Sequence, residues 1–226
     1  MKTKHTITAA VLALAAACAQ AAPYAITYES AITGSSIPTV IDPQRFTLTL
    51  VMDNDGSSTA NAEWVGADLT CAIWRMNDAA NVVVAHDMTL APPYSAVGRV
   101  TTDGGGTLTE VFSSVVSGSS VAPAAVRAIG LPPGDPLDNW AANSSNARVL
   151  FLASTHRFAD ASGHIQMTPA HWSSPVPFTG NCLDAAGPAS AGGGGIASVP
   201  TLGHAALALL SAFVGGLDLR MRRRNS

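Results

Sequence analysis

Two cysteines are the side chains of this sequence whose chemistry is easiest to predict. Cys71 and Cys182 would close a loop of 112 residues if they joined. An even pair of cysteines in an oxidising compartment forms a disulfide, and loop entropy alone would make this bridge worth about 4–5 kcal/mol. Two buried free thiols are the alternative. A metal site is disfavoured because the two cysteines lack the close spacing of zinc ligands.

A short acidic loop is the second candidate for chemistry. Residues 52–58 are MDNDGSS, so Asp53, Asp55 and Ser57 place oxygen side chains at alternate positions. Alternating oxygens can surround a calcium ion, but the glutamate that closes an EF-hand loop is missing. Asp55-Gly56 is also a strong hairpin-turn signal. We expect a turn here, and calcium binding remains the alternative.

The histidines and other reactive residue types show no catalytic pattern. His86, His156, His164 and His171 are scattered and form no HExxH motif, so we expect surface histidines and no metal site. The sequence has no GxSxG elbow, no phosphate-binding glycine loop followed by lysine, and no pair of carboxylates with a recognisable spacing. We therefore expect no catalytic residues, no cofactor and no enzyme activity.

The segments that must position these residues alternate between apolar and polar side chains, which is the pattern of half-buried strands. Loops rich in glycine, proline and aspartate separate them. About seven to nine short strands are expected, in an all-β, antiparallel β-sandwich. The expected strands are 24–33, 45–53, 67–76, 81–90, 106–118, 147–155 and 164–169, with 67–76 and 81–90 forming a hairpin. Only residues 122–131 indicate a short helix.

Four tryptophans are distributed over this pattern. Trp74 lies three residues after Cys71 on one expected strand, so the two side chains should point to opposite faces. Trp64, Trp140 and Trp172 lie near expected loops, where exposed rings could stack on sugars. We expect them to pack at the edge of the core instead, because large aromatic side chains are more often buried.

The first 21 residues have the three parts of a secretory signal peptide. Two lysines precede an apolar, alanine-rich run over residues 7–18, and a small-x-small sequence follows. Signal peptidase would cleave after Ala21, or less favourably after Ala22, with Ala19 as the other small residue of the site. Cys18 would leave with the signal. A lipoprotein signal ending at Cys18 is a minor alternative, and a permanent N-terminal anchor is disfavoured because the run is short.

The body that remains, residues 22–186, and the linker after it are acidic. Residues 22–198 hold six arginines, no lysine and fourteen acidic residues, which gives a net charge of −8. Nucleic-acid binding needs clustered lysine and arginine to neutralise phosphates. We therefore exclude nucleic acid as a partner.

The C-terminal residues have the layout of a marginal membrane anchor. Residues 187–198 are a flexible linker of glycine, alanine, serine and proline with one isoleucine. Residues 202–217 are apolar and would form a helix of about 24 Å, which is short of the roughly 30 Å hydrocarbon core. Four arginines follow and would stay in the cytoplasm: Arg220, Arg222, Arg223 and Arg224.

These ordered features of residues 199–226 resemble the IPTL-CTERM protein-sorting tails of Gram-negative bacteria, relatives of the PEP-CTERM tails. The motif stands here as Val199-Pro200-Thr201-Leu202, followed by Gly203. It has valine in place of the usual isoleucine, and it lacks the Trp-Gly that commonly follows. The resemblance implies that an exosortase-type membrane transpeptidase removes the tail and passes the body to the outer surface or extracellular matrix. The membrane span would then be transient.

The sequence therefore predicts an exported, non-enzymatic β-sandwich protein with a C-terminal sorting signal. A secreted carbohydrate-binding module that uses the loop tryptophans is one alternative. A secreted hydrolase with a site assembled from distant residues is another.

Overall fold

The fold is taken from a computed structural model that describes residues 22–90, 94–117, 123–131, 140–143 and 159–186. All of them belong to the first of two compact units, residues 1–194. The predicted signal peptide, linker and sorting tail lie outside the described residues, as do the expected strand 147–155 and His156. Those predictions, and the domain boundaries derived from them, remain predictions.

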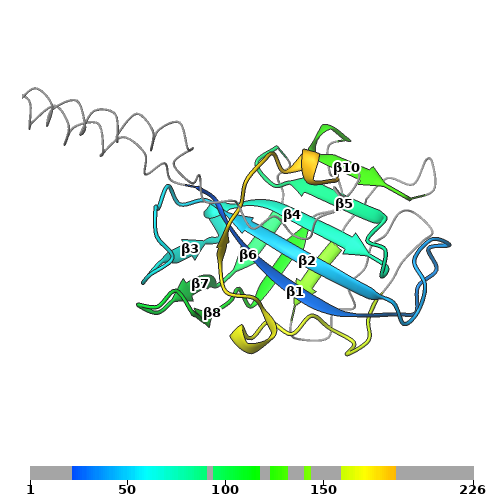
Figure 1. Cartoon of the computed structure of the whole chain (residues 1–226), viewed down its shortest axis with the longest axis horizontal. Coiled ribbons are helices and arrows are strands. Elements are labelled where there is room, and N and C mark those ends of the chain that lie inside the picture. The colour runs from blue at the N-terminus through cyan, green and yellow to red at the C-terminus, as the bar shows by residue number, and fades with distance from the viewer. Residues whose placement is uncertain (1–21, 91–93, 118–122, 132–139, 144–158, 187–226) are drawn as a thin grey trace, which may run out of the picture. The chain divides into compact units, whose positions relative to one another are not determined.

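A seven-stranded antiparallel sheet is the largest element of the body (Figure 1). Its strand order is β10-β5-β4-β2-β1-β12, and β13 pairs with another part of β1. The bounds are β1 Tyr24–Thr33, β2 Arg45–Met52, β4 Leu69–Met76, β5 Val82–Asp87, β10 Val126–Ile129, β12 Ala159–Asp160 and β13 Val176–Pro177. The long central strands β2 and β4 therefore have a hydrogen-bonded neighbour on each side.

Two three-stranded sheets complete the described strands. One has the order β11-β9-β6 and the other β3-β7-β8. Their bounds are β3 Glu63–Val65, β6 Tyr94–Val97, β7 Arg99–Thr102, β8 Leu108–Glu110, β9 Ser114–Ser117 and β11 Trp140–Asn143. Short 3-10 turns lie between strands: η2 Gly66–Asp68, η3 Pro123–Ala125, η4 Pro169–His171 and η5 Leu183–Ala186.

The main core lies between one face of the large sheet and the two small sheets. In β2, Phe46, Leu48 and Leu50 alternate with threonines, and all three are buried in a cluster that also holds Val115 and Val100 from the small sheets. Each buried side chain of this size contributes about 1.5–3 kcal/mol. The all-β, antiparallel prediction is confirmed. The expected sandwich had about seven to nine strands, whereas the described residues hold thirteen strands in three sheets.

The other face of the large sheet has a smaller core of its own. Ala25, Val51, Cys71, Ile73, Val83 and Ala85 form this outer cluster. Trp74 lies in the main core and Cys71 in the outer cluster, so the predicted opposition of these two side chains is confirmed. Phe178, Cys182, Leu183 and Ala185 pack over the outer cluster. The covering layer therefore comes from the C-terminal end of the body.

Three other sequence predictions can be compared with the structure. The predicted hairpin is confirmed as β4 and β5. The expected strand 106–118 is two short strands, β8 and β9, in different sheets. The expected strand 164–169 is wrong, because Ile165 and Met167 bury their side chains without a partner strand and Pro169 opens a 3-10 turn.

The helix expected over 122–131 is also wrong. Only η3 is helical, and β10 follows it, paired with β5 from Val126 opposite His86 to Ile129 opposite Val83. A short segment between a proline and a glycine offers few helical hydrogen bonds. Pairing with an existing strand satisfies its backbone more completely.

We predict that Gly130→Ala destabilises the fold much more than Gly163→Ala. Both glycines have positive φ, +76° and +85°, so either alanine costs about 1–2 kcal/mol in backbone strain. A Cβ at Gly130 would lie 2.5 Å from the backbone oxygen of Asn81, whereas nothing lies within 4 Å at Gly163. The clash should add roughly 1–3 kcal/mol. Urea denaturation of both variants measures the difference, and equal losses would contradict the prediction.

Candidate functional site

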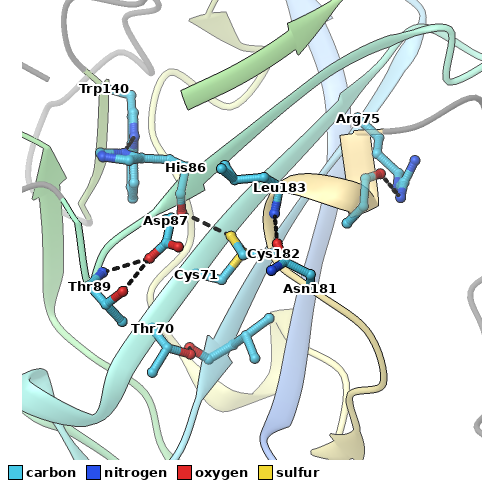
Figure 2. The surroundings of a disulfide bond; sticks show 12 residues. Thr70, Cys71, Arg75, His86, Asp87, Thr89, Trp140, Asn181, Cys182 and Leu183 are labelled. Atoms are coloured by element: carbon cyan, nitrogen blue, oxygen red, sulfur yellow. Dashed lines mark hydrogen bonds between the residues drawn. A yellow bond between two sulfur atoms is a disulfide. The ribbon is translucent and has the colours of Figure 1, made fainter. Parts of the chain in front are cut away.

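The predicted disulfide is present and fastens the C-terminal end of the body to the large sheet. Cys71 is the third residue of β4, and Cys182 directly precedes η5. Their sulfurs are bonded, and their Cα atoms lie 5.7 Å apart. Figure 2 shows the bridge beside His86, whose carbonyl oxygen lies 3.3 Å from Cys182 Sγ. Residues that are 111 positions apart are thus joined on the outer face of the sheet.

Residues 173–186, which we name the terminal segment, also make non-covalent contacts. Ser173 N–H donates to Thr27 O at 2.9 Å, and Thr27 N–H donates to Ser173 Oγ at 3.0 Å. β13 then pairs with the start of β1, and Phe178 N–H donates to Pro23 O at 2.7 Å. The terminal segment therefore lies beside the first described residues of the body, with contacts to Pro23 and to the start of β1.

Two arginines of the outer face hold the last turn of the terminal segment. Arg75 Nη2 donates to the carbonyl oxygen of Ala185 at 2.8 Å (Figure 2). Burial lowers the pKa of Arg75. Arg127 Nη1 lies 3.2 Å from Asp184 Oδ1, and both side chains are about half exposed or more. An exposed ion pair of this kind is worth about 0–1 kcal/mol. The disulfide is consequently the strongest single link in this region.

His86 is the most unusual ionisable residue of the body. It is fully buried at the inner face of β5, where Trp140 Nε1 donates to its Nδ1 at 3.1 Å. The neutral ring must then carry its hydrogen on Nε2, which has no hydrogen-bond partner among the described residues. Burial lowers the pKa of His86 to about 4, against a smaller opposing effect of Asp87. His86 therefore stays neutral inside the core.

The structure describes two other histidines, and neither forms a metal-binding cluster with His86. His164 Nε2 lies 3.0 Å from the side-chain nitrogen of Gln166, and His171 is exposed in η4. Among the residues that the structure describes, no three histidine, cysteine, aspartate or glutamate side chains come together to hold a metal ion.

The acidic loop that could have bound calcium uses its side chains to hold its own backbone. Asp55 N–H donates to Asp53 Oδ1, and Gly56 N–H donates to Asn54 Oδ1, both at 3.0 Å. Asp55 has the left-handed φ of 58° that such turns favour. The expected turn is present. The hairpin is not, because the loop joins β2 to β3, which belong to different sheets.

The loop tryptophans are buried. Trp64, Trp140 and Trp172 are 0%, 1% and 6% exposed and all belong to the main core. Trp172 Nε1 donates to Gln166 O at 2.9 Å, and Trp64 packs on Tyr24 with ring centroids 5.7 Å apart. The expectation that they pack is confirmed, although they lie inside the core and not at its edge. They form no exposed platform for a sugar.

Asp160 is a buried carboxylate for which the sequence predicted no role. It is fully buried and accepts a hydrogen bond from Tyr28 Oη at 2.8 Å, across 132 positions. Ser162 N–H and Oγ–H donate to its other oxygen at 2.7 and 2.5 Å. Burial, and next the bond to Asp160, raises the pKa of Tyr28. The Asp-x-Ser spacing signals this turn, but no local pattern points to Tyr28.

A shallow cleft of about 660 Å³ opens on the outer side of the large sheet, near the β4–β5 turn. Its charged lining residues are Glu29, Arg45, Arg75 and Asp78. Arg45 pairs with Glu29 at 2.9 Å, and its backbone N–H donates to Asp78 Oδ1. Two positive and two negative groups balance, so the charges of the cleft select neither an anion nor a cation.

Comparison with known proteins identifies only the end of the chain. Residues 197–224 match the IPTL-CTERM motif. No curated protein and no solved structure shows significant similarity to the chain. The match contains Val199-Pro200-Thr201-Leu202 and the four arginines, so the suspected sorting motif is confirmed. Within the described part of the chain, no helix is both long and apolar enough to cross a membrane. The predicted span over 202–217 lies outside that part.

We predict that the free energy of unfolding falls as the pH drops from about 6.5 to about 4. In this interval the unfolded chain protonates His86, with an ordinary pKa of 6.5, while the folded protein keeps it neutral down to about 4. The unfolded state binds more protons there, so stability rises with pH, by about 3 kcal/mol in total from this group.

Urea denaturation at pH 7 and pH 4.5 tests this prediction. Carboxylates also titrate in this range, so His86→Gln is the matched control, because it keeps a polar side chain and removes the titration. The variant should lose clearly less stability between the two pH values. Equal losses in both proteins would show that His86 does not carry the effect.

Proposed function

We propose that this chain is an exported surface protein without enzyme activity, sorted by a C-terminal signal that a membrane enzyme removes. The observation that carries the proposal is the IPTL-CTERM match over residues 197–224, which by itself indicates a secreted protein with a C-terminal sorting signal. Signal peptidase would first release the N-terminus of the body at Ala22. An exosortase-type transpeptidase would then cut at or near Val199–Leu202 and transfer the body to the outer surface or extracellular matrix.

The proposed transient anchor agrees with the length of the apolar run. A helix over residues 202–217 would be about 24 Å long, against about 30 Å of hydrocarbon. Such a span need hold the chain only until processing is complete. The arginines after it would keep the end of the chain on the cytoplasmic side, with the body on the outer side.

The body supports the exported part of this proposal. The Cys71–Cys182 bridge belongs in an oxidising compartment, since cytosolic thiols are kept reduced.

His86 and Asp160 are the fully buried ionisable residues among those described, and each is held by a hydrogen bond from an aromatic side chain. Neither lines the cleft, so neither can touch a substrate there. We assign both a structural role, in keeping with the proposal of a body that is carried and displayed.

We predict that the protein recovered from the cell surface of its host begins at Ala22 and ends near residues 198–202. Intact mass measurement gives both ends at once. Extra mass on this core would indicate a transferred glycan or lipid. A mass that runs to Ser226 would mean that the tail is a permanent anchor, and the processing proposal would be wrong.

Replacement of Val199, Pro200, Thr201 and Leu202 by alanine should abolish the processing. The variant should accumulate in the membrane fraction with its tail still attached, because the enzyme that recognises the motif can no longer bind it. Ser190→Ala in the linker is the matched control and should be processed like the native chain. Normal processing of the four-alanine variant would show that another part of the tail is recognised.

A further inference from the structure

A protein displayed through its C-terminal end is pulled from that end. On the proposed function, on which this inference rests, tension enters the body after Ala186. The terminal segment is the first part of the body to receive it. The contacts that resist this pull, and their order along the chain, decide how much of the body can come loose.

The non-covalent contacts of the terminal segment are weak against such a pull. They follow one another along the chain: the Arg75 and Arg127 contacts to η5, the Phe178 to Pro23 hydrogen bond, and the two residue pairs of β13 with β1. A pull from the C-terminal end would break them one after another. Residues 176–186 would peel away, and the apolar outer cluster beneath them would meet water.

When the disulfide is intact, the tension is transmitted through it to β4. Cys182 is bonded to Cys71, which lies in β4 with Val51 of β2 opposite on one side and Asp87 of β5 opposite on the other. β4 is internal in the sheet order and pairs with β2 from Phe46 opposite Met76 to Val51 opposite Cys71. Moving β4 along β2 requires these pairs to break together and not in sequence.

We propose that Cys71–Cys182 is a mechanical clamp, which carries tension from the displayed end of the chain into β4 and keeps the terminal segment closed. Only the residues after Cys182 extend when the tail is pulled. The Phe178 and β13 contacts carry no tension while the bond is intact. The outer cluster stays covered, and the edge of β1 stays paired.

Single-molecule pulling on the full chain tests the clamp. One handle is attached at Ser226, and the other at an azide-bearing residue that replaces Ile41, which is 57% exposed in the loop before β2. β2 is then pulled from its first residue, and β4 is pulled at Cys71, near its own first residue. Because the two strands are antiparallel, these points lie at opposite ends of the β2–β4 ladder, and the ladder of the oxidised protein is loaded in shear. The same molecule is pulled before and after reduction with a phosphine.

The reduced molecule should show one additional early step at low force. Residues 183–186 extend in both forms, so the added step comes from residues 176–182, which lengthen the chain by roughly 25 Å at about 3.3–3.6 Å per residue. The oxidised molecule should lack this step. An early step of the same length in the oxidised molecule would overturn the clamp, and so would its absence from the reduced one. Oxidised Arg127→Gln is the matched control: it removes an exposed ion pair of η5, which lies after Cys182, and should still show no step of this length.

Hydrogen exchange without applied force tests whether reduction disturbs more than the terminal segment. After reduction, the Phe178 and Ala185 amides should exchange at least tenfold faster, while the amides of the β2–β4 ladder keep their protection. If the ladder loses protection as well, the bond holds the whole fold and the clamp is wrong. Both measurements use the purified chain, so a failure of the proposed sorting, seen in the intact mass, is a separate result.

Discussion

The fold depends on the burial of β4 on both of its faces. Its side chains alternate between the main core, where Trp74 packs, and the outer cluster, where Cys71 and Ile73 lie. The small sheets cover the inner face, but in the described residues no sheet covers the outer one. That face exposes apolar side chains unless something else packs on it. The terminal segment fills this place, and the disulfide fixes it there.

The terminal segment also covers part of the edge of the large sheet, at β1. A free edge strand offers unpaired backbone groups to other chains. β1 is paired with β2 along one side, while its other side meets β12, the Tyr28–Trp172 bridge, Ser173 and β13 in succession. None of these partners is long. Their contacts come from more than a hundred positions away, so they depend on the body closing as a whole. The Asp160–Tyr28 hydrogen bond serves this closure from inside.

The sequence predicted the parts of the fold that rest on local pattern. The β1, β2, β4 and β5 strands are runs of six to ten residues rich in apolar and β-branched side chains, and their positions were correct to within a few residues. The disulfide followed from a count of two cysteines and an exported context. The errors lie where a short segment is decided by its distant partner. β10 is a strand because β5 offers it a ladder, and Ile165 is buried without being a strand. His86 looked like a surface histidine, since only the fold brings Trp140 to its Nδ1.

The tail could be identified from the sequence alone, whereas the long-range contacts of the body could not, and this difference has a physical basis. The proposed membrane enzyme would need only Val199–Leu202, an apolar run and a charged end, which are all linear features of the sequence. The disulfide, by contrast, joins residues whose meeting requires most of the body to fold first. It forms only in an oxidising compartment, the side of the membrane on which the proposed sorting takes place. Folding, closure of Cys71–Cys182 and attachment by the C-terminal end would therefore occur in the same place. A body fastened through its last residues gains most when those residues are bonded to its central sheet before any tension reaches them.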